Sequence, residues 1–520
     1  MIDQRLKNRK TVCKWNGIFM GPIADECGVE QGGIISSDLY KVYNNEQLNL
    51  AQVSNFGVPL GPVTVSGLGQ ADDVAHIAND LHSLQALLDL TLYYCEKYHV
   101  SLSTEKTKLQ VFSAKSSAME AFLGKSTSLL NIGGQRVDFV DEAEHVGIVR
   151  SVCGNLPHLL SRFVAHRRTL FKILSAGTAK SHRGNPAANL RAHNIYCNPV
   201  FFSGIAALSL TSSEVNLLDQ HVKVTVQRLQ KLQDKTPHCV VMFLGGHLPG
   251  KALLHLRLLS IFGMVSRIPG SFIHQIAWHQ LTSAKPSSGS WFLQIRELSL
   301  KYELPSPLSL LEHPMSQEAY RKLVKSRVVD FWETFLRAEA ARLEENSLKY
   351  FKPMFMSLTR PHLIWSTCGS NPYEVHKAVI QARMLSGRYM TEKLSRHWTV
   401  QNTYGLCTLP GCTGLVVGSL EHLLLFCPAL SEARNNIAQL CLKVASESEE
   451  IDLILKSALN NQTSDKVMQF LLDCSSLPTV IHLRQAGATD LIDRLFYVTR
   501  SWCYSIHRSR MNKLGLFHYR

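Results

Sequence analysis

The stretch GLGQADDVAHIANDL, residues 67 to 81, places two adjacent aspartates between two short segments in which apolar and polar residues alternate. Residues 63–70 and 74–78 follow the period of two that is typical of half-buried strands. The pattern predicts a β-hairpin with Asp72 and Asp73 at its tip. Two like charges on one tight turn repel each other unless a cation or water screens them, so this position calls for an explanation.

The residues after the hairpin predict a helix and further strands. Asn79 or Asp80 can cap a helix. Its apolar positions follow helical spacing and would cover one face of the hairpin: Leu81, Leu84, Leu88, Leu92 and Cys95. Residues 106–113 and 137–149 have the composition of strands. We therefore expect residues 1 to about 150 to form an open sheet with helices on one side, an α+β arrangement.

The composition indicates a folded, reduced protein without a membrane span. The chain has 520 residues, of which 45% are hydrophobic and 18% are charged. This length predicts several domains. The apolar run 199–210 is shorter than a membrane span, and the charged start MIDQRLKNRK is unlike a signal peptide. Thirteen scattered cysteines are not typical of a disulfide framework, so we expect a nuclear or cytoplasmic protein that is not secreted.

Positive charge is concentrated in one part of the chain. The net charge is +14, and residues 151–270 hold 14 Lys and Arg against only 3 acidic residues. Such a segment forms either a solvated basic surface or a surface for a polyanion. If it binds a polyanion, each neutralised phosphate steepens the salt dependence of binding.

Composition shifts divide the chain into six segments. The strand patterns fade after residue 150, and a Pro, Gly and Ser-rich linker separates two helical regions. The predicted segments are 1–150 (α+β), 151–282 (basic and helical), 283–290 (linker), 291–400 (helical), 401–432 (Cys- and His-containing) and 433–520 (helical tail).

The aspartate pair has the chemistry of a magnesium site. A hairpin would hold both carboxylates rigidly at one edge of a sheet, and oxygen ligands favour hard cations such as Mg²⁺. The alternative is a relic turn that binds no metal. Two carboxylates on one turn cannot complete the octahedral coordination of two magnesium ions, so an active site would need a third carboxylate from another strand.

The order of the neighbouring motifs resembles the palm of reverse transcriptases, especially those of non-LTR (LINE-type) retrotransposons. The hairpin with Ala-Asp-Asp follows GVEQGGIISSDLYKVYNNEQL (28–48) and precedes a helix, HVSLSTEKTKLQVF (99–112) and HVGIV (145–149). The resemblance covers residues 5 to about 280. It implies a partial polymerase palm, an antiparallel sheet with packed helices, followed by a mainly α-helical basic thumb.

The resemblance also implies an activity and roles for individual residues. The activity is RNA-directed DNA synthesis on an RNA template with a DNA primer or target, by nucleotidyl transfer with two metal ions. Asp72 would bind Mg²⁺ with Asp73 supporting it, and Lys106 would approach the triphosphate. Three residues would lie against the template and nucleotide, and two thumb residues would contact the nucleic acid: Gln31, Gly32 and Gly33, and Arg167 and Arg168.

The chain departs from the family at two points. The family has a further catalytic aspartate well upstream of the glutamine-glycine segment. Before Gln31 the chain offers only Asp3 and Asp25, neither within an apolar strand, so we expect the first catalytic strand to be absent and the chain alone to be inactive. Gln70 stands where the family usually has an aromatic residue. The competing hypothesis is a non-catalytic remnant or co-opted protein that binds RNA or DNA.

A second motif, CTLPGCTGLVVGSLEHLLLFCPAL (407–430), has the spacing C-x4-C-x9-H-x4-C. Its candidate ligands are Cys407, Cys412, His422 and Cys427, with the last two on one helix. Three thiolates and one imidazole suit structural Zn²⁺, and the alternative is a metal-free core segment. The motif is similar to the C-terminal zinc knuckle of LINE-type proteins, although its first spacing is longer. The aromatic and basic tail around Trp502 would either pack on the knuckle or touch nucleic acid.

Overall fold

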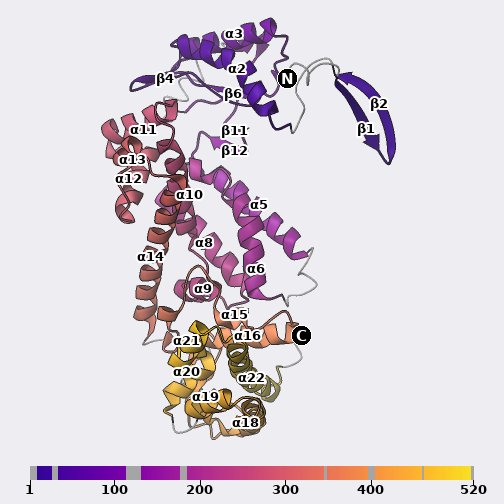
Figure 1. Cartoon of the computed structure of the whole chain (residues 1–520), viewed down its shortest axis with the longest axis vertical. Coiled ribbons are helices and arrows are strands. Elements are labelled where there is room, and N and C mark those ends of the chain that lie inside the picture. Colours follow the sequence, from indigo (N-terminus) through magenta and orange to yellow (C-terminus); the bar gives the residue numbers. More distant parts are fainter. Residues whose placement is uncertain are drawn as a thin grey trace. The chain divides into compact units, whose positions relative to one another are not determined.

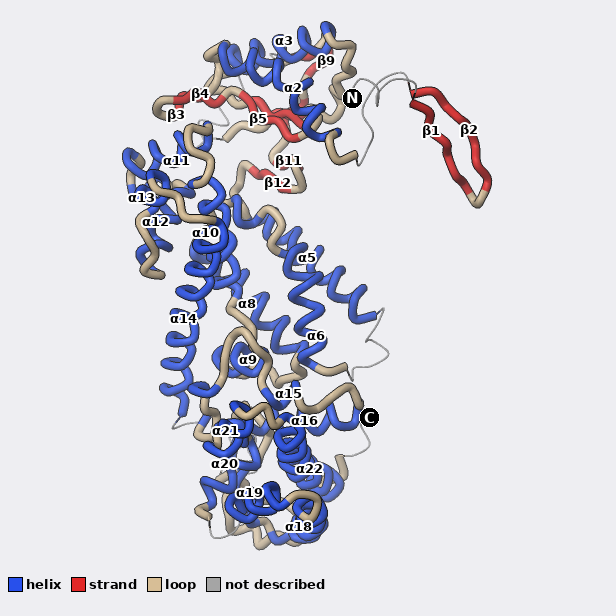
Figure 2. The backbone as a smooth tube through the Cα atoms, viewed as in Figure 1, coloured by secondary structure: helices blue, strands red, loops and turns tan. Residues whose placement is uncertain are grey.

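The computed structural model describes residues 9–25, 33–112, 130–175, 184–344, 348–395, 404–459 and 462–516. The chain forms two compact units. The first combines Met1–His158 with Ile268–Phe292, and the second combines Leu159–Arg267 with Leu293–Arg520. The predicted basic segment 151–282 therefore contributes to both units. Figure 1 shows the elements of each unit, and Figure 2 shows that the strands precede α5 (Leu156–Ile173).

The first unit is an α+β structure with small sheets. Every sheet among the described residues has two strands, and the pairs are antiparallel except for β7 with β10. The strands are β1 (Arg9–Trp15), β2 (Ile18–Asp25), β3 (Val58–Leu60), β4 (Val63–Val65), β5 (Gly67–Gln70), β6 (Asp73–His76), β7 (Lys108–Leu109), β8 (Asn131–Ile132), β9 (Gln135–Arg136), β10 (Asp138–Phe139), β11 (Glu142–His145) and β12 (Ile148–Ser151). The helices are α2 (Ser36–Val53), α3 (Leu81–Lys97) and α11 (Phe272–Ser283).

The predicted hairpin and its helix are present. β5 pairs with β6, and Gln70 lies opposite Asp73 in the register. Asp80 caps α3 by accepting a hydrogen bond from the Ser83 amide, and the stripe from Leu81 to Leu92 packs on a small core of Leu130, Ile132 and Val137. Another face of α3 covers the hairpin, where Thr91 Oγ1 lies 2.7 Å from His76 Nε2.

The prediction of one open sheet was wrong. The strand predicted over 106–113 is reduced to β7 within its described part. The strand predicted over 137–149 is interrupted by a turn at Val146 and Gly147, both with positive φ, which folds the chain back into the β11–β12 hairpin. A glycine in a strand pattern marks such a turn, and the prediction of one continuous strand overlooked it.

The second unit is helical. Its elements before residue 350 are α5, α6 (Pro186–Ala192), η2 (His193–Cys197), α7 (Asn198–Phe201), η3 (Ile205–Ala207), α8 (Ser212–Leu229), α9 (His238–Gly245), α10 (Gly250–Ser266), α12 (Trp291–Lys301), α13 (Pro307–Glu312) and α14 (Gln317–Leu343). The 3₁₀ turn η4 (Pro286–Ser288), in the predicted linker, belongs to the first unit. α9 is buried from Cys239 to Gly245 because its sequence after His238, CVVMFLG, is apolar on all sides. This helix forms the centre of the core.

The later elements of the second unit precede α22 (Thr489–Lys513), the last described helix. They are η6 (Pro353–Phe355), α15 (Leu363–Ser366), α16 (Pro372–Leu385), α17 (Glu392–Ser395), η7 (His422–Phe426), η8 (Pro428–Leu430), α18 (Ser431–Ala445), α19 (Glu449–Leu459), α20 (Ser464–Leu472), η9 (Cys474–Ser476) and α21 (Pro478–Gln485). α22 packs against α16, α18, α20 and α21. Among the described residues, no single helix has the length and apolar content to cross a membrane, and only the bent pair α9 and α10 meets both criteria together.

Candidate metal centre

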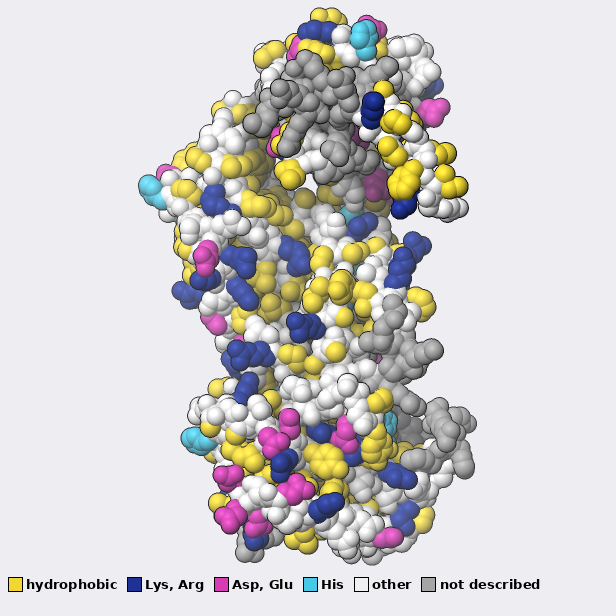
Figure 3. Space-filling model, turned by 45° about the vertical axis from the view of Figure 1, so that its right-hand side comes forward, with side chains coloured by type: hydrophobic (Ala, Val, Ile, Leu, Met, Phe, Trp, Pro, Cys, Tyr) yellow, Lys and Arg dark blue, Asp and Glu magenta, His cyan; other side chains and the backbone are white. Residues whose placement is uncertain are grey.

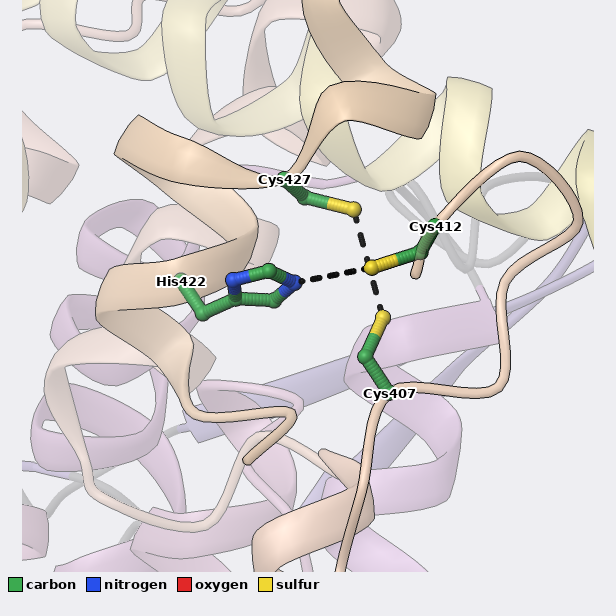
Figure 4. A group of neighbouring side chains, drawn as sticks. All are labelled: Cys407, Cys412, His422 and Cys427. Atoms are coloured by element: carbon green, nitrogen blue, oxygen red, sulfur yellow. Dashed lines mark hydrogen bonds between the residues drawn. The ribbon is translucent and has the colours of Figure 1, made fainter. Parts of the chain in front are cut away.

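The structure brings together the four predicted ligands of the Cys/His motif. Cys407, Cys412, His422 and Cys427 offer ligand atoms that all lie within 4.8 Å of one another. Figure 4 shows the three sulfur atoms and the imidazole pointing toward one another. Cys407, His422 and Cys427 are buried, and Cys412 is partly exposed. The four residues form a group that can hold a metal ion.

The separations agree with tetrahedral coordination. Metal–sulfur and metal–nitrogen bonds of about 2.3 and 2.0–2.1 Å give edges of about 3.8 Å between sulfurs and about 3.6 Å between sulfur and nitrogen. The Sγ atoms of Cys407 and Cys427 lie 3.9 Å apart, and Sγ of Cys412 lies 3.6 Å from Nε2 of His422. These distances leave room for one ion among the four atoms.

Local backbone geometry orients the first two ligands. Leu406 and Val417 form an antiparallel bridge, and the Cys407 amide donates to the Val416 carbonyl at 2.8 Å. The loop closes through Gly411 and Gly414, which have φ of 90° and 70°. Because other residues rarely adopt positive φ, these glycines permit the tight return of the chain.

The last two ligands lie on a wider helical turn than expected. The sequence predicts one helix that presents His422 and Cys427, but η7 is a π-helix and Cys427 is its C-cap. The Cys427 amide donates to the His422 carbonyl at 2.7 Å, an i→i+5 bond. This bond widens the turn and ends the helix before Pro428, so both side chains reach the same centre.

Residues outside the motif support the centre. The buried Glu392 carboxylate pairs with Arg510 of α22 at 3.2 Å. A Cβ at Gly418 would lie only 2.8 Å from the Cβ of Glu392, so only glycine allows this approach. Trp502 of α22 donates to the Leu424 carbonyl at 3.4 Å. The expected packing of the tail on the knuckle is confirmed for these contacts.

Burial and hydrogen bonds shift the pKa values of the three thiols in different directions. Burial raises the pKa of Cys407 to about 12 and also raises the pKa of Cys427. For Cys412, burial acts in the same direction, but hydrogen bonds, first among them one from the Gly414 backbone, outweigh it and lower the pKa. Burial lowers the pKa of His422, which favours the neutral imidazole that binds a metal.

The predicted polymerase residues lie in a different setting. Asp72 and Asp73 are exposed at the β5–β6 turn, which Asn44 of α2 anchors by donating to the Ala71 carbonyl at 3.2 Å. Burial and the nearby Asp72 carboxylate raise the pKa of Tyr40, a phenol close to the turn that the sequence interpretation missed. No third acidic side chain joins the pair in a metal-binding group among the described residues.

The remaining predicted residues are dispersed. Lys106 is exposed in the turn before β7, and Gly33 precedes α2 with its carbonyl accepting from the Ser36 amide. Gln31 and Gly32 lie outside the described residues. Arg167 and Arg168 are exposed on α5.

A buried Ser, His and Asp group has a structural role. Ser475 Oγ lies 3.1 Å and Asp473 Oδ1 lies 3.3 Å from the same nitrogen, Nε2 of His362. The other nitrogen, Nδ1, accepts from the Ile364 amide at 3.2 Å. A nucleophilic triad needs serine and aspartate on opposite ring nitrogens, so this arrangement ties α15 to η9 and is not catalytic.

The chain matches no protein-family model and no curated protein. Two features of the molecule bear on its function: the four-ligand group and the surface chemistry of the helices.

Proposed function

We propose that this chain binds nucleic acid through the outward face of α5 and that a zinc ion orders its C-terminal part. Its motifs support descent from the reverse transcriptase of a non-LTR retrotransposon. The observation that carries the binding proposal is the chemistry of α5, because this helix combines cationic and apolar side chains on one exposed face.

The two faces of α5 follow helical spacing. Leu159, Phe163 and His166 are buried. The opposite face exposes two aliphatic residues, three basic residues and one aromatic residue: Leu160, Val164, Arg167, Arg168, Phe171 and Lys172. α5 contains no acidic residue. Figure 3 shows Lys and Arg side chains among hydrophobic ones over the helices of the second unit, whereas Asp and Glu gather toward its C-terminal elements.

This combination fits a single-stranded nucleic acid. Arg167 and Arg168 make no ion pair with a described acidic residue, so both guanidinium groups can bind phosphates. Phe171 is 73% exposed, and Tyr196 of η2 is also exposed. Exposed rings offer a surface on which bases stack. Arg257, by contrast, packs its guanidinium 4.0 Å from the Phe202 ring centre in the interior, so not every basic residue of the segment serves binding.

Zinc is the metal that the donor set of the centre favours. Three thiolates and one imidazole at tetrahedral separations are typical of structural zinc sites, and protein ligands fill all four positions. The ion would stabilise the connection between α17 and α18. It would have no open position for a substrate.

Nucleotidyl transfer is the second candidate, and the aspartate hairpin favours it. Asp72 and Asp73 project from a rigid turn and would hold Mg²⁺, which supplies charge neutralisation for the triphosphate. Lys106 would approach the phosphates, and Gln31 and Gly32 would lie along the template. The reaction also needs a third carboxylate, which the described residues do not bring to the pair. We therefore propose RNA or DNA binding as the activity of this chain.

The binding proposal is tested by the salt dependence of affinity. Fluorescence anisotropy with a labelled single-stranded RNA is measured over a range of salt concentrations. Arg167→Ala with Arg168→Ala should reduce the slope of log K against log salt by about 1.4, since each phosphate contact on a single strand contributes about 0.7. The control is Lys322→Ala with Lys325→Ala, which removes the same charge from the exposed face of α14.

Equal slopes for the two double variants would exclude α5 as the binding surface. A primer-extension assay in Mg²⁺ on the same RNA separates the candidates. Extension that Asp72→Asn abolishes would establish polymerase activity and overturn the proposal of binding alone. Binding without extension supports it.

A further inference from the structure

Three histidines form a hydrogen-bonded chain in the core of the second unit. His166 of α5 and His193 of η2 are buried, and His221 of α8 is partly exposed. Nδ1 of His166 lies 3.0 Å from Nε2 of His221, and Nε2 of His166 lies 2.9 Å from Nε2 of His193. We call these three residues the histidine chain. It joins three helical elements through the side chain of His166.

The positions of the ring hydrogens in the histidine chain follow from the donor and acceptor nitrogens that each imidazole offers. A neutral imidazole has one N–H and one acceptor nitrogen, so His166 donates at one nitrogen and accepts at the other. Nδ1 of His193 is buried and has no partner among the described residues. Leaving an N–H there would cost more than leaving a lone pair. Nε2–H of His193 therefore donates to His166, whose Nδ1–H donates to His221.

The surroundings of the histidine chain are cationic or become so on protonation. Arg167 on α5 and Arg228 on α8 face His221, and Arg167 also faces His166. His247, from the connection between α9 and α10, faces His193. The other close neighbours are neutral: Phe163 stacks on His221 with ring centres 4.2 Å apart, Phe201 lies 5.0 Å from His166, and the Asn194 side chain faces His193. No neighbour in this set supplies a negative charge.

We propose that the histidine chain is an acid-sensitive lock that holds α5 against η2 and α8 only while its members are neutral. A proton added to His166 makes both of its nitrogens donors. His193 must then accept at Nε2 and carry its hydrogen at Nδ1, which forms no hydrogen bond of normal geometry in this structure. The Arg167 guanidinium also repels the added charge on His166. Acidification therefore breaks the bonds of His166 and releases α5 from its neighbours.

The pH range follows from the pKa directions. Burial lowers the pKa of His166 and of His221 to about 4, and burial also lowers the pKa of His193. An unfolded histidine has a pKa of about 6.5, so unfolding takes up protons below that pH. The contribution of the lock to stability is complete above about pH 6.5 and is lost as pH falls toward 4.

Hydrogen–deuterium exchange of the full chain tests the lock. Protection of α5 peptides is measured at pH 7.5 and 5.0 and corrected for the intrinsic exchange rates. His166→Gln keeps an acceptor for His193 and a donor for His221 but cannot be protonated. The acid-induced increase of the α5 opening constant should be about 25-fold smaller in this variant, the factor expected for one histidine shifted from about 6.5 to about 4.

His313→Gln is the matched control, because His313 is exposed after α13. It should open α5 on acidification as the wild type does. If His166→Gln does not fold, His221→Gln removes the partly exposed end of the histidine chain and should show a reduction in the same direction. The proposal is overturned if the glutamine variants open as steeply as the wild type, or if His313→Gln flattens the pH dependence equally.

Discussion

The aspartate hairpin and the Cys/His centre use the same kind of sequence signal but obtain their ligands differently. The hairpin supplies two carboxylates from one turn, and both remain exposed. The centre collects four ligands from a segment of 21 residues, and three of them are buried. A complete ligand set within one loop makes a metal site independent of distant chain segments. A partial set leaves the site dependent on other strands.

Removing one ligand of the centre should have the largest effect. Cys427→Ala leaves three ligands around a buried space, and the bound zinc should fall from about one ion per chain to nearly none. Proteolysis should then cut between α17 and α18. Elemental analysis and limited digestion measure both effects. Cys503→Ala, an equally buried thiol outside the group, should retain its metal. Equal zinc content in both variants would show that the thiols form only a core.

Substituting the α22 residue that supports the centre should have the second-largest effect. Arg510→Met removes one partner of a buried ion pair and takes the guanidinium charge away from the buried Glu392 carboxylate, which costs about 3–5 kcal/mol. Urea unfolding measures the loss. Arg508→Met, two residues away on α22 and exposed, should change stability by about 0.5 kcal/mol or less. If the two variants were equally stable, the centre would not depend on the final helix, and the loop alone would account for the stability of the centre.

Substitutions in the aspartate hairpin should have the smallest effect on stability. Asp72→Asn and Asp73→Asn should each alter the free energy of unfolding by about 0.5 kcal/mol or less, because both side chains are exposed. Adding Mg²⁺ should leave the unfolding temperature unchanged in the wild type and in both variants. A Mg²⁺-dependent stabilisation that Asp72→Asn removes would break the contrast between the two regions, because it would reveal a carboxylate supplied from elsewhere.

Local features were predictable from the sequence, and long-range ones were not. The β5–β6 hairpin, the Asp80 cap and the four metal ligands each depend on residues close together in the chain. The π-helical geometry of η7 depends on one i→i+5 bond that spacing alone does not reveal.

The supporting contacts come from distant residues. Arg510 and Glu392 are 118 positions apart, and the members of the histidine chain are 27 and 55 apart. A single sequence carries no signal for such pairs when each residue also has an ordinary local role. The hydrophobic pattern predicted strands but not their division into separate pairs, because pairing depends on which edges meet in three dimensions.

The position of α22 has a consequence for how the chain is made. Its side chains complete the packing of α16: Arg500 binds Glu374 across 126 positions, and Thr499 accepts from Gln381 across 118. A ribosome delivers α16 more than a hundred residues before α22. Until then the face of α16 that packs on α22 is uncovered, and we expect the nascent second unit to bind chaperones. A frameshift or stop codon before Thr489 would remove the helix against which α16, α18, α20 and α21 pack.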